Sequence, residues 1–168
     1  MRSKLLFFVI LNSSLLILNS EAQMTWNQAC YFEGTSSSYC AVPHSSLLNI
    51  TGDFTVEMWV NPDSSTNGAQ ILLQKRAPGN NVGYTLYLSS GKVAIRTNSS
   101  TRLIGKTVIQ NHQWTHIAGT YDSSSAIFRV YINGVLDTSS TTASASPISN
   151  TDSLFIGVGS NGPFKGMM

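Results

Sequence analysis

The stretch from residue 114 to residue 136 constrains the fold more than any other part of the chain, because it predicts an antiparallel β-meander. Apolar and polar side chains alternate over residues 114–121 and again over residues 127–132, which is the pattern of half-buried strands. A serine-rich turn separates the two. Asn133-Gly134 follows the second strand, and both residues tolerate the positive φ of a type I′ hairpin turn. The sequence therefore predicts an all-β protein.

Short strand patterns occur along the rest of the chain, separated by Gly, Pro or Asn at intervals of about ten residues. No long helical periodicity is present. This spacing of strands and turns is typical of a β-sandwich. We predict further strands at residues 29–33, 38–42, 54–60, 69–75, 84–88, 93–96, 102–109 and 154–158, and one helical turn at residues 45–48.

Several of these segments resemble one known family. The meander segments W-T-H-I-A-G-T-Y-D and R-V-Y-I-N-G-V-L, together with G-D-F-T-V-E-M-W-V at residues 52–60 and L-F-I-G at residues 154–157, are similar to laminin-G-like domains of the concanavalin A-like lectin/glucanase superfamily. The resemblance covers residues 28–166 and implies an antiparallel jelly-roll β-sandwich. Such domains serve glycan binding, adhesion, recognition or spacing, so the resemblance alone leaves the function open.

The resemblance also bears on both ends of the domain. F-E-G at residues 32–34 and V-P-H-S-S at residues 42–46 resemble the family's opening hairpin. F-K-G-M at residues 164–167 resembles the start of the family's last strand, which usually continues further. We therefore expect a C-terminally truncated domain that is missing its last strand, with an unpaired edge near the opening hairpin. We also expect further domains beyond Met168.

The first 22 residues have the pattern of a secretory signal peptide. Arg2 and Lys4 precede an apolar run, and S-E-A at residues 20–22 fits a cleavage site. Cleavage would leave a secreted, extracellular domain at residues 23–168. A transmembrane anchor is the alternative, but the apolar run is short and interrupted. No second apolar segment follows, so we expect no membrane span in the mature chain.

Charged side chains are few and scattered along the sequence. Without the signal peptide, the chain carries 8 basic and 7 acidic side chains. The absence of a basic stripe makes nucleic acid and anionic membranes poor candidate partners. The expected partners are carbohydrate or an extracellular or cell-surface protein.

Cys30 and Cys40 lie on the two arms of the expected opening hairpin. If Glu33 pairs with Ser37 around the G-T-S-S turn, the register places Cys30 opposite Cys40. An even number of cysteines in an exported protein favours a disulfide, so we predict that these two are bridged. Two separate small core side chains are the alternative. No third or fourth ligand has the spacing of a metal site.

Two N-glycosylation sequons occur on expected loops, at Asn49 and at Asn98. They are relevant only in a eukaryotic secretory pathway. The composition does not establish that pathway, so glycosylation stays conditional.

Calcium is common in the superfamily that the chain resembles. Acidic residues near predicted strand ends are the candidate ligands, namely Glu33, Asp53, Asp122 and Asp152. None of them forms an EF-hand-like run, and an Asp at a turn more often caps its own backbone. The metal ligands are therefore left open.

The sequence contains no catalytic signature. Related glucanases need two carboxyl groups facing one cleft. The strand at residues 54–60 supplies only Glu57, since Asp53 belongs to the turn before it. The G-x-G-x-x-G match at residues 157–162 is followed by Pro163 instead of a helix, which indicates a β-turn rather than a dinucleotide site. We predict a protein that is not an enzyme.

Two pairs of side chains suggest a binding face. Glu57 and Trp59 share one side of their strand, and Trp114 and His116 share one side of another. If both pairs point into the concave face of a sheet, they offer aromatic rings with hydrogen-bonding groups, which suits a sugar ring. Simple packing of the aromatic rings is the alternative.

We therefore expect a recognition or adhesion module that binds carbohydrate on a cell surface or matrix without covalent chemistry. A structural accessory domain of a larger exported protein is one alternative. A module that targets a carbohydrate-active enzyme is another. Solvent-exposed aromatic residues would favour binding, whereas a filled apolar face would favour the structural role.

Overall fold

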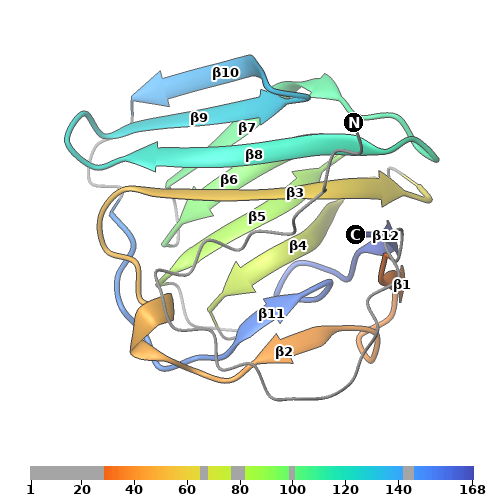
Figure 1. Cartoon of the computed structure of the whole chain (residues 1–168), viewed down its shortest axis with the longest axis horizontal. Coiled ribbons are helices and arrows are strands. Elements are labelled where there is room, and N and C mark those ends of the chain that lie inside the picture. Colours follow the sequence, from red (N-terminus) through yellow and green to blue (C-terminus); the bar gives the residue numbers. More distant parts are fainter. Residues whose placement is uncertain (1–28, 65–67, 77–81, 99–100, 142–145) are drawn as a thin grey trace, which may run out of the picture.

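The computed structural model describes residues 29–64, 68–76, 82–98, 101–141 and 146–168. The predicted signal peptide lies outside these residues. Two six-stranded sheets face each other and form a sandwich (Figure 1). Sheet I has the order β1-β12-β3-β8-β9-β10, and sheet II has the order β2-β11-β4-β5-β6-β7. The elements are β1 (Tyr31–Glu33), β2 (Cys40–Val42), the 3-10 turn η1 (Ser46–Leu48), β3 (Phe54–Pro62), β4 (Ala69–Lys75), β5 (Tyr84–Ser89), β6 (Lys92–Thr97), β7 (Thr101–Val108), β8 (Thr115–Asp122), β9 (Ile127–Ile132), β10 (Val135–Thr141), β11 (Leu154–Ile156) and β12 (Lys165–Met167).

The antiparallel jelly-roll sandwich predicted from the sequence is confirmed. β4 and β9 have the predicted bounds, and β3 extends two residues further, to Pro62. The helical turn is also where it was predicted, and the Ser45 hydroxyl caps it by accepting a hydrogen bond from the Leu47 N–H at 3.3 Å. β10 continues into a segment rich in serine and threonine and ends at Thr141. Its polar residues still pair with β9, as Ser140 does with Phe128.

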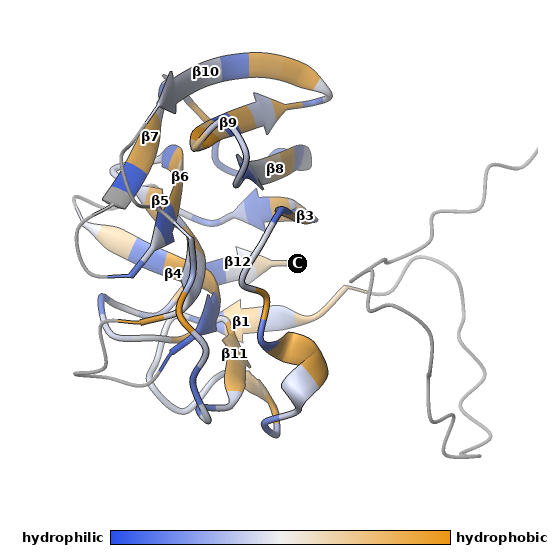
Figure 2. Cartoon of the chain, turned by 90° about the vertical axis from the view of Figure 1, so that its left-hand side faces the viewer, coloured by the Kyte–Doolittle hydropathy of each residue, from blue (hydrophilic) through white to orange (hydrophobic). Residues whose placement is uncertain are grey.

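The hydrophobic core lies between the sheets and is built from alternate residues of their strands. Figure 2 shows the sheets edge-on as two layers. Aromatic rings join the layers. The ring centroid of Phe54 on β3 lies 5.6 Å from that of Tyr84 on β5 and 5.9 Å from that of Tyr121 on β8. Gly119 permits β8 to approach sheet II closely, because a Cβ there would lie 2.8 Å from Ile95 Cδ1. Burial of these apolar surfaces holds the two sheets together.

The turn between β9 and β10 has the predicted type I′ backbone. Asn133 and Gly134 have φ values of 51° and 79°. The Asn133 N–H donates to the His116 carbonyl at 2.8 Å, and Asn133 Oδ1 accepts from the His116 N–H at 3.0 Å. The turn is therefore tied to β8, which keeps the three strands of the meander in register.

The predicted opening hairpin is wrong. β1 pairs with β12, with Phe32 opposite Gly166, whereas β2 pairs with β11, with Cys40 opposite Ile156. The two strands belong to different sheets, because each finds its partner near the C-terminal end of the chain. The register that would have placed Cys30 opposite Cys40 does not exist, and both cysteines are exposed free thiols. The predicted disulfide is therefore not formed in this structure.

The expectation of an unpaired opening strand is also wrong. β12 lies between β1 and β3, with Gly166 opposite both Phe32 and Pro62. Met168 and Cys30 exchange two backbone hydrogen bonds, at 2.9 and 3.0 Å. Residues 165–168 thus fill the position beside β1 that the sequence interpretation had left vacant.

The G-x-G-x-x-G segment forms a turn, as predicted. The Gly157 N–H donates to the Leu72 carbonyl at 3.0 Å, and the Ile71 N–H donates to the Gly162 carbonyl at 3.0 Å. Gly157 has a φ of 85°, and a Cβ there would lie 2.2 Å from the Phe32 ring. The glycine is needed for backbone conformation and close packing, and the segment serves the core.

Lys75, at the end of β4, is a buried cation whose hydrogen bonds are satisfied. It is 1% exposed, and Nζ donates to the Asn150 carbonyl at 3.2 Å, to Asn150 Oδ1 at 2.8 Å and to the Asp152 carbonyl at 2.6 Å. Burial lowers the pKa of Lys75, and the charge of Asp152 opposes that change. Three acceptors compensate the ammonium group for lost water and hold the segment before β11 against β4.

Asp137 on β10 connects the edges of the two sheets. Its Oδ2 accepts from the Lys106 N–H at 2.6 Å and its Oδ1 accepts from the Thr107 N–H at 3.1 Å, both on β7. Figure 2 shows β10 and β7 side by side at this end of the sandwich. Burial raises the pKa of Asp137, but the hydrogen bonds from Thr107 and Lys106 outweigh it and hold the pKa below its usual value. The carboxylate thus occupies backbone donors of an edge strand.

We predict that Asp137→Ala lowers the free energy of unfolding by about 1–2 kcal/mol, because two backbone donors lose a charged acceptor. The native pKa is lowered, so this stabilisation is present above the unfolded pKa and is lost as the pH falls through the folded value. Urea unfolding at neutral and acidic pH measures both effects. Ser139→Ala, at an exposed position of the same strand, is the control. Equal stability of Asp137→Ala and the parent at neutral pH would contradict the assignment.

Candidate functional site

The side of sheet I that faces away from the core carries the predicted binding residues. Side chains alternate along a strand, and the core-facing residues of β3 and β8 leave Glu57, Trp59 and His116 on the opposite side. The register places Trp59 opposite His116 and Glu57 opposite Ala118. We call this surface the outer face of sheet I. Its members are Thr55, Glu57, Trp59, Trp114, His116, Ala118, Thr120, Arg129 and Tyr131.

Three of the predicted site residues are in contact with one another. The ring centroids of Trp59 and His116 lie 5.4 Å apart at an interplanar angle of 59°. His116 Nε2 lies 3.7 Å from Glu57 Oε2, and the side chains of His116 and Glu57 are 26% and 43% exposed. An indole, an imidazole and a carboxylate are therefore together on a surface that solvent can reach.

Trp114 stands apart from this group. It precedes β8 directly and is 40% exposed. The alternation along β8 puts it on the same side as His116. Among the described residues, no ring contact joins it to Trp59 or His116. Trp114 therefore extends the surface at one end instead of completing the cluster.

The structure adds residues that the sequence interpretation missed. Tyr131 on β9 lies opposite Ala118, and Arg129 lies opposite Thr120, which in turn lies opposite Thr55 on β3. The rows of the outer face are two residues apart, so it extends for about 13 Å along β3. The signal for Tyr131 and Arg129 was present, since they alternate with the core residues of β9.

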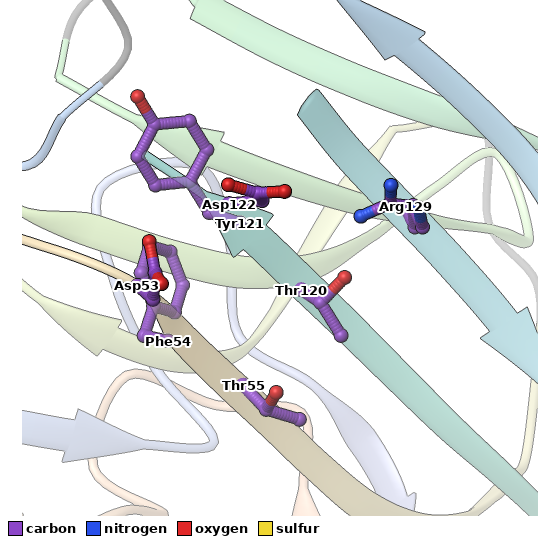
Figure 3. A pocket seen from close by; sticks show the side chains of 7 residues that line it. All are labelled: Asp53, Phe54, Thr55, Thr120, Tyr121, Asp122 and Arg129. Carbon is purple, nitrogen blue, oxygen red and sulfur yellow. The ribbon is translucent and has the colours of Figure 1, made fainter. Parts of the chain in front are cut away.

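An open hollow of about 460 Å³ lies at the end of the outer face away from Trp59, where β3 begins and β8 ends. Figure 3 shows Thr55, Thr120 and Arg129 in a row across β3, β8 and β9, with Asp53 and Asp122 at one side. The lining is mainly polar. It supplies hydroxyl groups, carboxylates and one guanidinium group.

Both carboxylates of the hollow hold the serine-rich turn after β8. Asp53 Oδ1 accepts from the Ser123 N–H at 2.7 Å and from the Ser123 hydroxyl at 2.6 Å. Asp122 Oδ1 accepts from the Ser124 hydroxyl at 2.7 Å and from the N–H groups of Ser124 and Ser125 at 3.0 and 3.2 Å. As expected, these Asp residues cap a turn of the backbone.

The hydrogen bonds lower the pKa of both groups. The Ser123 hydroxyl and N–H lower the pKa of Asp53. The pKa of Asp122 falls to about 2 because the Ser125 and Ser124 hydroxyls and N–H groups surround its carboxylate. The Ser125 hydroxyl itself makes no hydrogen bond of good geometry. The hydrogen bonds to the Asp122 carboxylate therefore come from the Ser124 hydroxyl and from the N–H groups of Ser124 and Ser125. Both carboxylates stay ionised in ordinary conditions.

The candidate calcium ligands are not brought together. Asp53 and Asp122 share the hollow, but the Asp152 carbonyl accepts from Lys75 at the other sheet, and Glu33 lies on β1. Within the described ranges, no group of three acidic, His or Cys side chains could hold a metal ion.

The two sequon asparagines make hydrogen bonds in the fold. Asn49 Oδ1 accepts from the Asn150 N–H at 3.3 Å. Asn98 Nδ2, the atom that would carry a glycan, donates to the Ser146 carbonyl at 2.8 Å. A glycan at Asn98 would replace that bond, whereas the bond of Asn49 leaves its Nδ2 available. Glycosylation stays a prediction.

The sequence match now identifies the family. The family Laminin_G_3, described as the concanavalin A-like lectin/glucanases superfamily, matches residues 33–168. The chain belongs to this family, which confirms the laminin-G-like resemblance. No curated protein sequence matches the chain. Over the described residues, no helix has the length and apolar character needed to cross a bilayer.

Solved structures share the fold. CBM40 of the Ruminococcus gnavus IT-sialidase, bound to α2,3-sialyllactose, has a TM-score of 0.68 at 13% identity over 84% of this chain and 86% of that chain. Domain 4 of AbnA, a GH43 extracellular arabinanase from Geobacillus stearothermophilus in complex with arabinotriose, has a TM-score of 0.63 at 26% identity over 83% and 66%. Domains LG4-5 of the mouse laminin α1 chain have a TM-score of 0.62 at 14% identity over 78% and 34%. The chain also covers 41% of a solved protein from Bacteroides ovatus.

We predict that Asp122→Asn reduces the acid sensitivity of the fold. The stabilisation from Asp122 is fully present above its ordinary pKa of 3.8 and is lost as the pH falls through about 2. The variant should therefore show a smaller loss of stability across this interval in thermal unfolding followed by circular dichroism. Ser124→Ala removes one donor and should give an intermediate slope. A parent protein with no change of stability between these pH values would contradict the prediction.

Proposed function

We propose that this domain is a secreted, non-catalytic module that binds carbohydrate through the outer face of sheet I. The contact of Trp59 with His116 and Glu57 carries the proposal. A sugar ring presents C–H groups that stack on an indole and hydroxyl groups that hydrogen-bond to a carboxylate and an imidazole. Tyr131 and Thr55 add hydroxyl groups along the same face.

The exposure of the aromatic residues supports binding over a purely structural role. Trp114 is 40% exposed, and Trp59 is partly exposed, although large aromatic side chains are usually covered in a core. A spacer domain has no need of an aromatic surface beside hydrogen-bonding groups. This arrangement fits recognition of a polar ligand with apolar faces.

The placement of the carboxylates supports a non-catalytic role. A glycosidase needs two carboxyl groups about 5–10 Å apart across the scissile bond. On the outer face, two acidic side chains occur in the strand segments described, Glu57 and Asp122. Asp122 lies at the end of β8, and its carboxylate is bonded to the turn that follows. It lies four residues, roughly 13 Å, beyond the residue opposite Glu57. Asp53 lies four residues before Glu57, roughly 13 Å along the strand, and its carboxylate is bonded to Ser123.

The similar structures support a glycan as the ligand. The Ruminococcus gnavus module is described in complex with sialyllactose, and the arabinanase domain in complex with arabinotriose. The proteins that carry these domains are a sialidase and an extracellular arabinanase. We propose accordingly that the chain acts outside the cell, as a recognition or adhesion module of a surface or matrix.

We predict that Trp59→Ala weakens glycan binding about tenfold or more, because it removes the stacking surface. Trp114→Ala should weaken it less, since Trp114 lies outside the contact cluster. A broad glycan array with and without calcium would identify the ligand, and isothermal titration would measure the dissociation constants.

Tyr39→Ala is the matched control. Tyr39 is an exposed aromatic residue, 47% exposed, that packs on Phe155 at the edge of sheet II. Its replacement should leave binding unchanged. The proposal fails if the intact domain binds no glycan in the array, or if the Tyr39 variant loses binding while the Trp59 variant retains it.

A further inference from the structure

Sheet II gathers basic side chains on the face that points away from the core. The register places Gln74 of β4, Thr85 of β5, Arg96 of β6 and Arg102 of β7 opposite one another in one row. These strands are neighbours in Figure 1. The sequence suggested scattered charges without a stripe. That expectation is incomplete, because cross-strand pairing brings the arginines together.

Arg96 has hydrogen-bond donors that the fold leaves unused. Its guanidinium group lies over the Tyr87 ring, 5.5 Å from the centroid. Two of its nitrogen atoms, Nε and Nη2, are buried without a hydrogen-bond partner, and so is the hydroxyl oxygen of Thr85 directly opposite. Thr85 is 1% exposed. Buried polar groups are nearly always paired, so adjacent unpaired donors call for an explanation.

Within the described residues, no carboxylate is bonded to the Arg96 guanidinium group. Burial lowers the pKa of Arg96, the Tyr87 charge opposes this, and the Arg102 charge lowers it further. Burial and the charge of Arg96 also lower the pKa of Arg76. None of these interactions involves a carboxylate. The acidic residues that the structure describes lie elsewhere. They are Glu33 on β1, Glu57 on the outer face of sheet I, Asp53 and Asp122 in the hollow, Asp63 beside Tyr31, Asp152 beside Lys75 and Asp137 beside β7.

Lys75 shows that the same sheet can satisfy a buried cation. Its ammonium group has three oxygen acceptors from Asn150 and Asp152. Arg96 has a ring beneath it and, among the residues that the structure describes, no acceptor for Nε or Nη2. Donors that are already bonded to the protein cannot bond to a ligand. The unpaired donors of Arg96 can do so, whereas the ammonium group of Lys75 cannot.

The geometry points to a second binding site, in which Arg96 and Thr85 take an anionic group of an acidic glycan, with Arg102 at the solvent side. Nε–H and Nη2–H lie on the same edge of a guanidinium group and match the two oxygen atoms of a carboxylate or sulfate. The Thr85 hydroxyl can donate to the same group. Arg102 is exposed and Arg96 partly exposed, so the row opens toward solvent at β7.

The site is separate from the outer face of sheet I. That the anion belongs to a glycan rests on the proposed function, whereas the unpaired donors do not. A ligand with sugar rings and acidic groups would suit both sites. Either two parts of one molecule or two separate molecules would occupy them.

The test compares sugars that differ in one group. Methyl β-glucuronide and glucose 6-sulfate carry a carboxylate and a sulfate, and methyl β-glucoside carries neither. NMR titrations of the full secreted chain would follow the Arg Nε–H signals and give dissociation constants. We expect the two acidic sugars to bind at least about tenfold more tightly than the glucoside and to shift the Arg96 signal.

The variants separate a binding role from a structural one. Arg96→Gln should abolish the preference for acidic sugars, and Arg96→Lys should retain only part of it, because lysine keeps the charge and loses the fork. Arg96→Lys keeps a cation over the Tyr87 ring and should leave the thermal midpoint without ligand unchanged, whereas Arg96→Gln also loses that contact and should lower it slightly. Lys165→Gln, which removes an exposed cation on β12 outside both proposed sites, is the control and should keep the preference.

Three outcomes overturn the inference. Equal binding of the acidic and neutral sugars would do so, and if that binding still depended on Trp59, the proposed function would stand by itself. A response to inorganic sulfate alone, with none to the acidic sugars, would mean an adventitious ion only. If no sugar binds at all, both proposals fail. If sugars bind, loss of all binding in the Trp59 variant and loss of the acidic preference in the Arg96 variant report on the two proposals separately.

Discussion

The register of β3, β8 and β9 is the constraint on which both the core and the outer face of sheet I depend. Each of these strands gives one set of side chains to the core and the alternate set to the surface. A slip of one residue would exchange the two sets. Asn133 opposes such a slip, because it bonds to both backbone groups of His116. Gly119 does so as well, since no larger residue fits against Ile95.

The two sheets share a core but present different chemistry to solvent. Sheet I shows an aromatic surface with Glu57 beside the rings and with Arg129 and Asp122 at its far end. Sheet II shows a basic row around Arg96. Because the core uses only the inner side chains, either outer face can change without loss of packing. This independence is a physical reason why one jelly roll can carry more than one recognition site.

Closure of the sandwich relies on contacts between residues distant in sequence. β12 inserts between β1 and β3, Asp137 joins β10 to β7, and Lys75 holds the segment before β11. Each of these three contacts uses hydrogen-bonding groups that have no partner among their neighbours in the sequence. They cover the strand edges and the backbone groups that the core itself cannot reach.

The sequence by itself determined the strands of the meander, the type I′ turn and most other strands. It also determined that Glu57 and Trp59 share one face of their strand and that Trp114 and His116 share one face of theirs. These features follow from alternation and turn chemistry within a few residues. Only the tertiary structure decided the partners of β1, β2 and β12, which overturned the predicted hairpin of Cys30 and Cys40. It also brought Glu57 and Trp59 to His116, and Arg96 to Thr85 and Arg102. The reason is that pairing between distant strands depends on the total packing of both sheets, which no local pattern contains.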